Sequence, residues 1–122
     1  MIVKTSRKYQ MIDRLFVPLN KEWYKLFASG KKKWEMRGYS PRFNEKTVKV
    51  GRSIELRKGY MKEGAIWGVI TEFHITNNVH ELPLKVIEEL FPIPPSSPLW
   101  EYIQWYNAKY NKFIVFKIEV KE

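Results

Sequence analysis

One short segment of the chain combines residue types that bind anions and exchange protons. Residues 29–37 read Ser-Gly-Lys-Lys-Lys-Trp-Glu-Met-Arg. On a strand, Glu35 and Arg37 share one face and lie about 7 Å apart, close enough for an ion pair or a joint contact. A carboxylate beside an arginine orients the guanidinium, which is the side chain best suited to grip phosphate through two hydrogen bonds. The segment therefore contains the residue types of a phosphate-binding site.

The same pattern has a second interpretation, which the charge pattern taken alone favours. A solvent-exposed strand face with several lysines is a common device that keeps the edge of a sheet from pairing with another chain. The elements around the segment and the charge of the whole chain must therefore decide between the two.

The charge of the chain is uneven. The 122 residues contain 22 Lys and Arg and 13 Asp and Glu, a net charge of +9. Residues 1–60 hold 16 of the basic and 5 of the acidic residues, a net charge of +11, whereas residues 61–122 carry −2. A domain whose excess charge lies in one half presents one basic surface, which favours polyanions such as nucleic acid. The alternative is a basic charge that serves only solubility; no long basic amphipathic helix favours a membrane surface.

Length and composition indicate one globular domain spanning residues 1–122. Hydrophobic residues make up 44% of the chain and charged residues 29%, which is close to the globular norm. The chain has no cysteine, which excludes disulfides and a thiol nucleophile and is compatible with a cytoplasmic protein. No apolar run reaches the roughly 20 residues that span a bilayer. We expect residues 1–10, which are polar and basic, to form a flexible arm.

We expect neither a cofactor nor a metal. His74 and His80 are the only histidines, they lie six residues apart, and no acid-rich motif accompanies them, so a zinc site is not favoured. The glycine-rich loops that cradle nucleotide phosphates and the Gly-x-Ser-x-Gly nucleophile motif are absent from the sequence.

The elements around the ionic segment can be predicted from periodicity and capping signals. Residues 15–17 have strand composition, and residues 21–29 show helical spacing with Asn20 as the N-cap. Gly30 stands where a left-handed residue ends a helix, so it turns the chain into a strand at residues 33–37. A polar loop covering 38–49 follows.

The second half of the chain continues with short elements. We predict strands at 52–58, 65–75 and 113–120 and helices at 81–91 and 98–110, with Gly68 marking a bulge. Short strands whose helices do not alternate with them favour an α+β fold or a small barrel over a doubly wound sheet.

The spacing Gly30-x-Lys32-x-x-Glu35-x-Arg37 resembles the signature of the ASCH family, a branch of the PUA-like superfamily. The sequence Val50-Gly51-Arg52-Ser53-Ile54 is similar to that family's entry into its next strand, with Arg52 where an acid is usual. The resemblance covers roughly residues 14–120. It implies an α+β fold, a small PUA-like β-barrel of about five or six strands with flanking helices. It also implies a cleft that takes RNA or a nucleotide-like ligand.

The candidate binding residues come from the resemblance and from the residues themselves. The resemblance implies that Lys32, Glu35 and Arg37 line the cleft and that Gly30 shapes its rim. The residues themselves place Lys31 and Lys32 at its mouth, basic side chains on an extended phosphate-binding surface, and tyrosines at strand ends for base stacking. A solvated charge or a core aromatic is the alternative at each of these positions. The full candidate set is Gly30, Lys31, Lys32, Glu35, Arg37, Tyr39, Arg42, Arg57, Lys58 and Tyr60.

Whether the protein is an enzyme is left open by the sequence. One enzymatic branch that resembles this fold hydrolyses the acetyl amide of N4-acetylcytidine with a lysine, a threonine and a glutamate. Lys32 matches that lysine, but Glu35 occupies the position of the threonine, so the hydroxyl nucleophile is missing. We therefore predict a domain that binds RNA, single-stranded nucleic acid or a nucleotide, with a hydrolase of a modified nucleoside or of RNA as the alternative. A third reading is an adaptor with an exposed apolar patch for protein partners.

Overall fold

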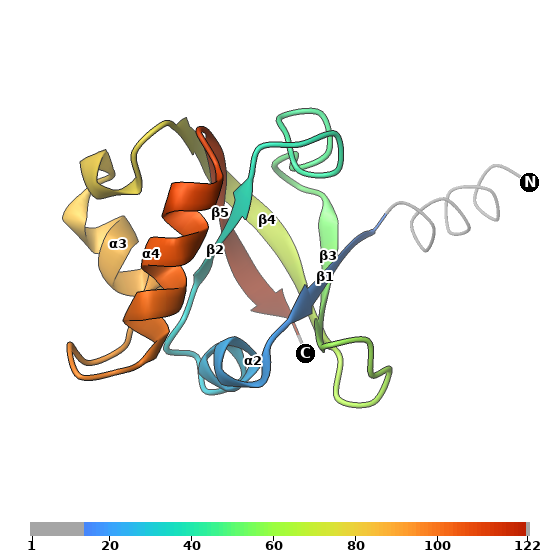
Figure 1. The fold of residues 1–122 in the computed structure, drawn as a ribbon. Helices are drawn as coiled ribbons and strands as arrows, with labels where there is room; N and C mark the ends of the chain where they lie inside the picture. Colours follow the sequence, from blue (N-terminus) through green and yellow to red (C-terminus); the bar gives the residue numbers. More distant parts are fainter. Residues whose placement is uncertain (1–13, 122) are drawn as a thin grey trace, which may run out of the picture.

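The computed structural model describes residues 14–121, and the arm predicted at 1–10 lies outside this range. Five strands form one curved sheet, with α2 at one end and α3 and α4 together on one side (Figure 1). The elements in chain order are β1 (Leu15–Leu19), α2 (Lys21–Ala28), β2 (Trp34–Gly38), β3 (Ser53–Lys58), β4 (Ile66–Thr76), the 3₁₀ turn η1 (Val79–Glu81), α3 (Leu84–Leu90), α4 (Leu99–Lys109) and β5 (Phe113–Lys121).

The sheet is mixed and curls into a half-barrel. Its strand order is β1-β3-β4-β5-β2, with β1 parallel to β3 and the other neighbours antiparallel. The edge strands β1 and β2 approach each other across the open side of the half-barrel. A hydrogen bond of 2.7 Å joins them there, from Nη2 of Arg37 in β2 to the carbonyl oxygen of Pro18 in β1. Proline lacks an N–H and suits such an edge position. The α+β class and the small barrel predicted from the sequence are confirmed, with five strands.

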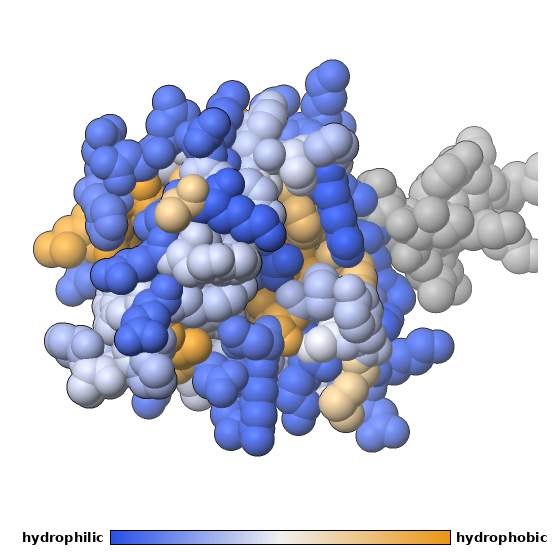
Figure 2. All heavy atoms as spheres, viewed as in Figure 1, coloured by the Kyte–Doolittle hydropathy of each residue, from blue (hydrophilic) through white to orange (hydrophobic). Residues whose placement is uncertain are grey.

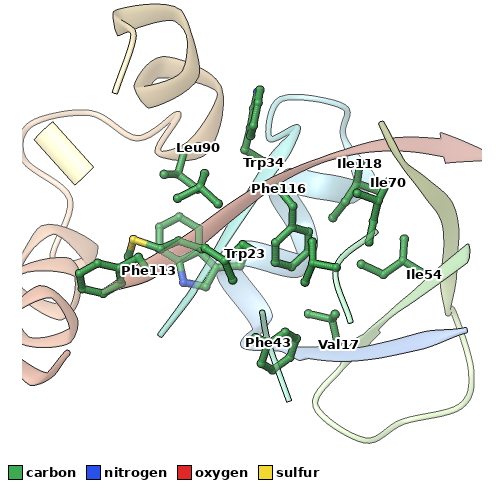
Figure 3. Close-up of a cluster of buried hydrophobic side chains, with 14 of the residues drawn as sticks. Val17, Trp23, Trp34, Phe43, Ile54, Ile70, Leu90, Phe113, Phe116 and Ile118 are labelled. Atoms are coloured by element: carbon green, nitrogen blue, oxygen red, sulfur yellow. The ribbon is translucent and has the colours of Figure 1, made fainter. Parts of the chain in front are cut away.

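The core fills the concave side of the sheet and the space under the helices (Figure 3). In β5 the residues from Phe113 to Phe116 are all buried, because both faces of this strand are covered. The ring of Phe113 lies 6.1 Å from that of Tyr106 in α4, and Phe116 stacks at 6.4 Å on Phe43 from the loop after β2. A strand that is covered on both faces carries a continuous apolar run instead of an alternating one.

The local signals around α2 are confirmed. Asn20 Oδ1 accepts a hydrogen bond of 2.8 Å from the backbone N–H of Trp23, as an N-cap side chain does. Gly30 adopts a left-handed conformation with φ of +79°, which ends the helix and directs the chain into β2. Trp23 and Phe27 form the buried face of the helix.

Two details of the later elements differ from expectation. The bulge predicted at Gly68 is wrong: Gly68 pairs regularly with Ile54 and Val120, and the irregularity of β4 lies between Ile70 and Glu72. Gly68 instead permits close packing, because a Cβ atom there would lie 2.7 Å from Cγ2 of Ile118.

The helix predicted at 81–91 is shorter and is preceded by a separate turn. Pro83 occupies the N-cap of α3, so the 3₁₀ turn and the α-helix form two elements. Among the described residues, no helix has the length and hydrophobicity that crossing a bilayer requires.

Candidate functional site

A pocket of about 120 Å³ lies on the open side of the half-barrel, where β1 and β2 approach each other. Lys32, Glu35 and Arg37 all line it. The turn after α2 supplies Lys32 and β2 supplies the other two, so one short stretch of chain delivers all three ionic groups. The rest of the lining comes from β1, α2, α4 and their flanks: Pro18, Leu19, Asn20, Trp23, Met36, Phe91, Tyr102, Ile103 and Tyr106.

Lys32 lies inside the pocket wall and not at the pocket mouth, where the sequence placed it. Its side chain is buried, with 2% of its surface exposed, and its Nζ donates to the carbonyl oxygen of Leu90. The same Nζ lies 4.6 Å from the ring centroid of Trp23 and 3.7 Å from Oε1 of Glu35. Burial lowers the pKa of Lys32 to about 8; Glu35 counteracts this effect and Arg37 adds to it. At neutral pH Lys32 is therefore mainly protonated, with a minor neutral fraction.

Glu35 and Arg37 form the ion pair that their spacing predicted. Oε2 of Glu35 accepts from Nη2 of Arg37 at 2.8 Å and from its Nε at 3.1 Å, and Oε1 accepts from the backbone N–H of Met36 at 3.2 Å. Only 6% of Glu35 is exposed, because its face of β2 lines the pocket, so the interpretation of this face as a solvent-exposed strand surface is wrong for Glu35. Among residues 14–121 no group accepts from Nη1 of Arg37, so this nitrogen keeps its two donors for a ligand.

Aromatic rings enclose the charged groups. Tyr106 is fixed by its hydroxyl, which accepts from the backbone N–H of Gly38 at 2.8 Å, and Tyr102 lies one helical turn away with 44% of its surface exposed. Burial raises the pKa of both tyrosines, so both hydroxyls are neutral at physiological pH. Trp23 and Phe91 contribute two further rings. The pocket thus joins a polar floor to flat apolar walls.

Sequence reasoning missed the contribution of α4 to this pocket. The sequence predicted a helix at 98–110, but no residue of this helix was named as a site residue. The spacing of Tyr102 and Tyr106 by four residues put both on one helix face and was the available signal.

The other sequence candidates lie outside the pocket. Gly30 ends α2 and borders a separate groove beside Lys33 and Glu72. Lys31 is exposed, and the Nζ of Lys58 lies 5.7 Å from the ring centroid of Tyr24.

The last candidates occupy two other places on the surface. The Tyr39 hydroxyl donates a hydrogen bond to Glu45 on the loop after β2, and Nζ of Lys112 lies 4.2 Å from the centroid of the Tyr39 ring. Arg42, Arg57 and Tyr60 gather around Phe16 on the outer face of β1. Within residues 14–121 no three histidine or acidic side chains lie together as a metal site would need.

Comparison with known proteins places this geometry in a fold. No family model and no curated protein sequence matches the chain. A crystal structure of the hypothetical protein PH0355 matches with a TM-score of 0.63 and 21% identity over 87% of this chain and 97% of that one. A mutant of ZmASCH from Zymomonas mobilis matches with a TM-score of 0.61 and 18% identity over 85% and 67% of the two chains. The NMR structure of PF0455 from Pyrococcus furiosus matches with a TM-score of 0.57 and 23% identity over 89% of this chain and 98% of that one.

The chain has the ASCH fold. The half-barrel with its three α-helices is therefore of the α+β, PUA-like type, as the signature implied. Within this ASCH fold, the signature residues occupy the turn after α2 and the edge strand β2, on the open side of the half-barrel. At 18% to 23% identity the likeness concerns the fold, so the role of the pocket must be argued from its own groups.

Proposed function

We propose that this domain binds RNA by holding one base in the pocket formed by β1, β2 and α4. The observation that carries the proposal is the convergence of Lys32, Glu35 and Arg37 on a single hollow with aromatic walls. Proteins that read single-stranded or extruded bases combine these two features, flat rings for stacking and polar groups for the base edge. The net charge of +9 and the general association of the ASCH fold with nucleic acid favour the same ligand.

The size of the pocket selects a single-ring base. A cavity of about 150 Å³ in another protein accommodates benzene. The present pocket, at about 120 Å³, is of similar size and opens to solvent, so we propose that it takes one six-membered ring and leaves the sugar and phosphate outside. A purine would leave its second ring in the mouth. We therefore propose a pyrimidine as the preferred ligand.

The polar groups match the edge of such a base. A glutamate accepts hydrogen bonds from an exocyclic amino group, and cytosine N4 is the pyrimidine donor. Lys32 can donate to a carbonyl oxygen or a nearby phosphate, and so can Nη1 of Arg37, which has no acceptor among residues 14–121. Because Glu35 and Lys32 are buried, a ligand that leaves them unpaired costs more than one that pairs them. Cytosine pairs a donor with the carboxylate and an acceptor with the cations, which uracil does less well.

A hydrolase remains the second candidate because of one observation, the lowered pKa of Lys32. A neutral amine fraction at neutral pH can act as a base or a nucleophile. Among the described residues that line the pocket, however, the hydroxyls belong to Tyr102 and Tyr106, and both stay protonated. Incubation with N4-acetylcytidine and with RNA, with and without Mg²⁺, tests turnover: product formation that is lost in Lys32→Met favours the enzyme.

The adaptor reading has less support on the face shown in Figure 2. Hydrophilic residues cover most of that face, and the apolar residues appear as small separate patches between them. A surface for a protein partner would present a continuous apolar patch.

The binding proposal is tested by comparing nucleotides on one pair of variants. Glu35→Gln keeps the shape of the side chain and removes its charge, while Glu119→Gln removes the same charge from an exposed site on β5. We expect wild type and Glu119→Gln to bind cytidine monophosphate more tightly than adenosine monophosphate in titration calorimetry. We expect Glu35→Gln to lose about tenfold or more for the cytidine nucleotide. Equal affinities of the two variants contradict the site, and tighter binding of the purine contradicts the single-ring argument.

A further inference from the structure

Charged and aromatic side chains continue from the pocket onto the outer surface of the sheet. Two arginines contact the ring of Phe43. Cζ of Arg37, a pocket residue, lies 5.2 Å from the ring centroid, and Cζ of Arg42, which lies outside the pocket, is 5.4 Å from it. Arg42 reaches further to β1, where its Nη2 donates to the carbonyl oxygen of Phe16 at 3.1 Å. Phe43 therefore joins the pocket to the outer face of β1.

Strand register extends this arrangement across three strands. Phe16 of β1 pairs with Glu55 of β3, and Glu55 pairs with Trp67 of β4. Arg57 places Cζ 4.8 Å from the ring centroid of Phe16 and donates from Nε to Oε2 of Glu55 at 2.5 Å. Nε of Arg14 lies 2.7 Å from Oε1 of the same carboxylate in an ion pair, and Cζ of Arg14 lies 4.4 Å from the ring centroid of Trp67. We call the six residues Arg42, Phe16, Arg57, Glu55, Arg14 and Trp67 the arginine–aromatic ladder.

The ladder holds its guanidinium groups in fixed directions. Glu55 faces outward yet is only 3% exposed, because two arginines and the neighbouring rings cover it. Each of its oxygens lies within 2.7 Å of the Nε of one arginine, and these ion pairs fix the two guanidinium groups against the carboxylate. Three arginines against one glutamate leave the ladder with a charge of +2. A buried carboxylate of this kind is often no more stabilising than apolar packing, so a purely structural role does not account for the half-buried Arg14 and Arg57 and the exposed Arg42.

We infer that the ladder binds the nucleotides that flank the pocket base on a single RNA strand. The inference rests on the proposed function, because the strand enters the pocket through one base. Guanidinium groups stacked on rings present their N–H groups to phosphate oxygens, and such contacts supply most of the affinity in nucleic-acid complexes. Tyr60 offers a base a stacking surface: 76% of it is exposed and its ring lies 5.8 Å from that of Phe16. From β1 to β4 the ladder spans two interstrand steps, about 10 Å.

The first test measures the salt dependence of binding. Arg42→Gln removes one ladder cation that pairs with no carboxylate among the described residues, and Lys85→Gln removes one exposed cation from α3, which lies far from β1 and β3 in Figure 1. With a hexacytidylate oligonucleotide, we expect Arg42→Gln to make the slope of log K against log salt concentration shallower by about 0.7, the value for one phosphate contact on a single strand. Lys85→Gln should leave the slope unchanged, and neither variant should alter the affinity for cytidine monophosphate.

The second test separates stacking from charge. Tyr60→Leu removes the exposed ring and no charge, so it should weaken hexacytidylate binding about tenfold without changing the salt slope. A sulfated polysaccharide has no bases, so its binding should not respond to this variant. If the polysaccharide binds as tightly as the oligonucleotide and Tyr60→Leu changes neither, the surface is a general polyanion site and the RNA inference is overturned.

The outcomes also separate this inference from the proposed function. If Arg42→Gln and Tyr60→Leu weaken oligonucleotide binding no more than Lys85→Gln does, the role of the ladder is overturned. The affinity for cytidine monophosphate then still tests the pocket independently. If the ladder variants weaken the oligonucleotide but Glu35→Gln does not affect cytidine monophosphate, the ladder stands and the pocket proposal fails. Absence of any oligonucleotide binding overturns both.

Discussion

Replacement of Lys32 by methionine tests whether burial controls this amine. Methionine has a similar length and is apolar, so it fits among the rings of Trp23, Phe27 and Phe91, which lie 4.6 to 5.6 Å from Nζ. The variant removes the cation that burial disfavours, and it also leaves the carbonyl oxygen of Leu90 without its donor.

The magnitude follows from the pKa of Lys32, which burial lowers from 10.5 to about 8. At about 1.4 kcal/mol per pKa unit, this corresponds to roughly 3 kcal/mol against the charged amine in the folded state. Between pH 8 and 10.5 the unfolded chain binds more protons than the folded chain, so the free energy of unfolding of the wild type rises with pH in this window. Below pH 8 the whole penalty is present. The variant has no such group.

The difference between the two proteins is therefore the measured quantity. At pH 7 the variant gains roughly 3 kcal/mol because it has no buried cation, and it loses about 1–3 kcal/mol because the carbonyl oxygen of Leu90 is unpaired, so the two proteins have similar stability. At pH 10 the amine of the folded wild type is neutral, so most of the variant's gain is lost and the variant is less stable than wild type by about 1–3 kcal/mol. The raised pKa values of Tyr102 and Tyr106 affect both proteins and cancel in the difference.

Urea unfolding followed by tryptophan fluorescence at pH 7, 8, 9 and 10 gives the required free energies. Lys31→Met is the matched control, because it removes an exposed lysine next in sequence by the same substitution. A difference between wild type and Lys32→Met that stays constant within about 0.5 kcal/mol would refute the assignment of a low pKa to Lys32.

Three further predictions concern the same region. Arg37→Ala should lower the free energy of unfolding by about 3–5 kcal/mol, because it leaves Glu35 without its nearest cation and removes the hydrogen bond from β2 to the carbonyl oxygen of Pro18 in β1. Urea unfolding measures this free energy, and a loss below about 1 kcal/mol contradicts the bridging role of Arg37. Nucleotide affinity should fall above pH 8 as Lys32 loses its proton, and a profile by titration calorimetry that stays flat to pH 10 argues against contact with this amine. Gly38→Ala should destabilise the fold by about 1–3 kcal/mol, since its Cβ would lie 2.4 Å from Cδ1 of Tyr110; an unchanged thermal midpoint would show that the ring moves aside freely.

Signals between residues close in sequence predicted much of the fold. The N-cap Asn20, the left-handed Gly30 and the ion pair of Glu35 with Arg37 were all read from neighbours within a few positions, and all are present. The hydrophobic periods of the strands were equally informative, because side-chain direction on a strand depends only on the local alternation.

Burial of charged side chains could not be predicted in this way. Glu55 alternates along β3 with the buried Ile54 and Leu56, a pattern typical of a solvent-facing position, yet Glu55 is itself buried. It is buried because Arg14 and Arg57 cover it, and the register between β1 and β3 that places them there depends on pairing across nearly 40 residues of chain.

The local sequence thus specified which groups can do chemistry and the short stretch of chain that carries them. The sheet order β1-β3-β4-β5-β2 determined their surroundings, because it brings the first and second strands of the chain to opposite edges and closes them around Lys32 and Arg37. It also places α4, some 70 residues further along, over the same hollow. A hydrogen-bonded neighbour in space carries no mark in the sequence when so many residues separate it, and the enclosure of the ionic groups therefore became visible only in the folded molecule.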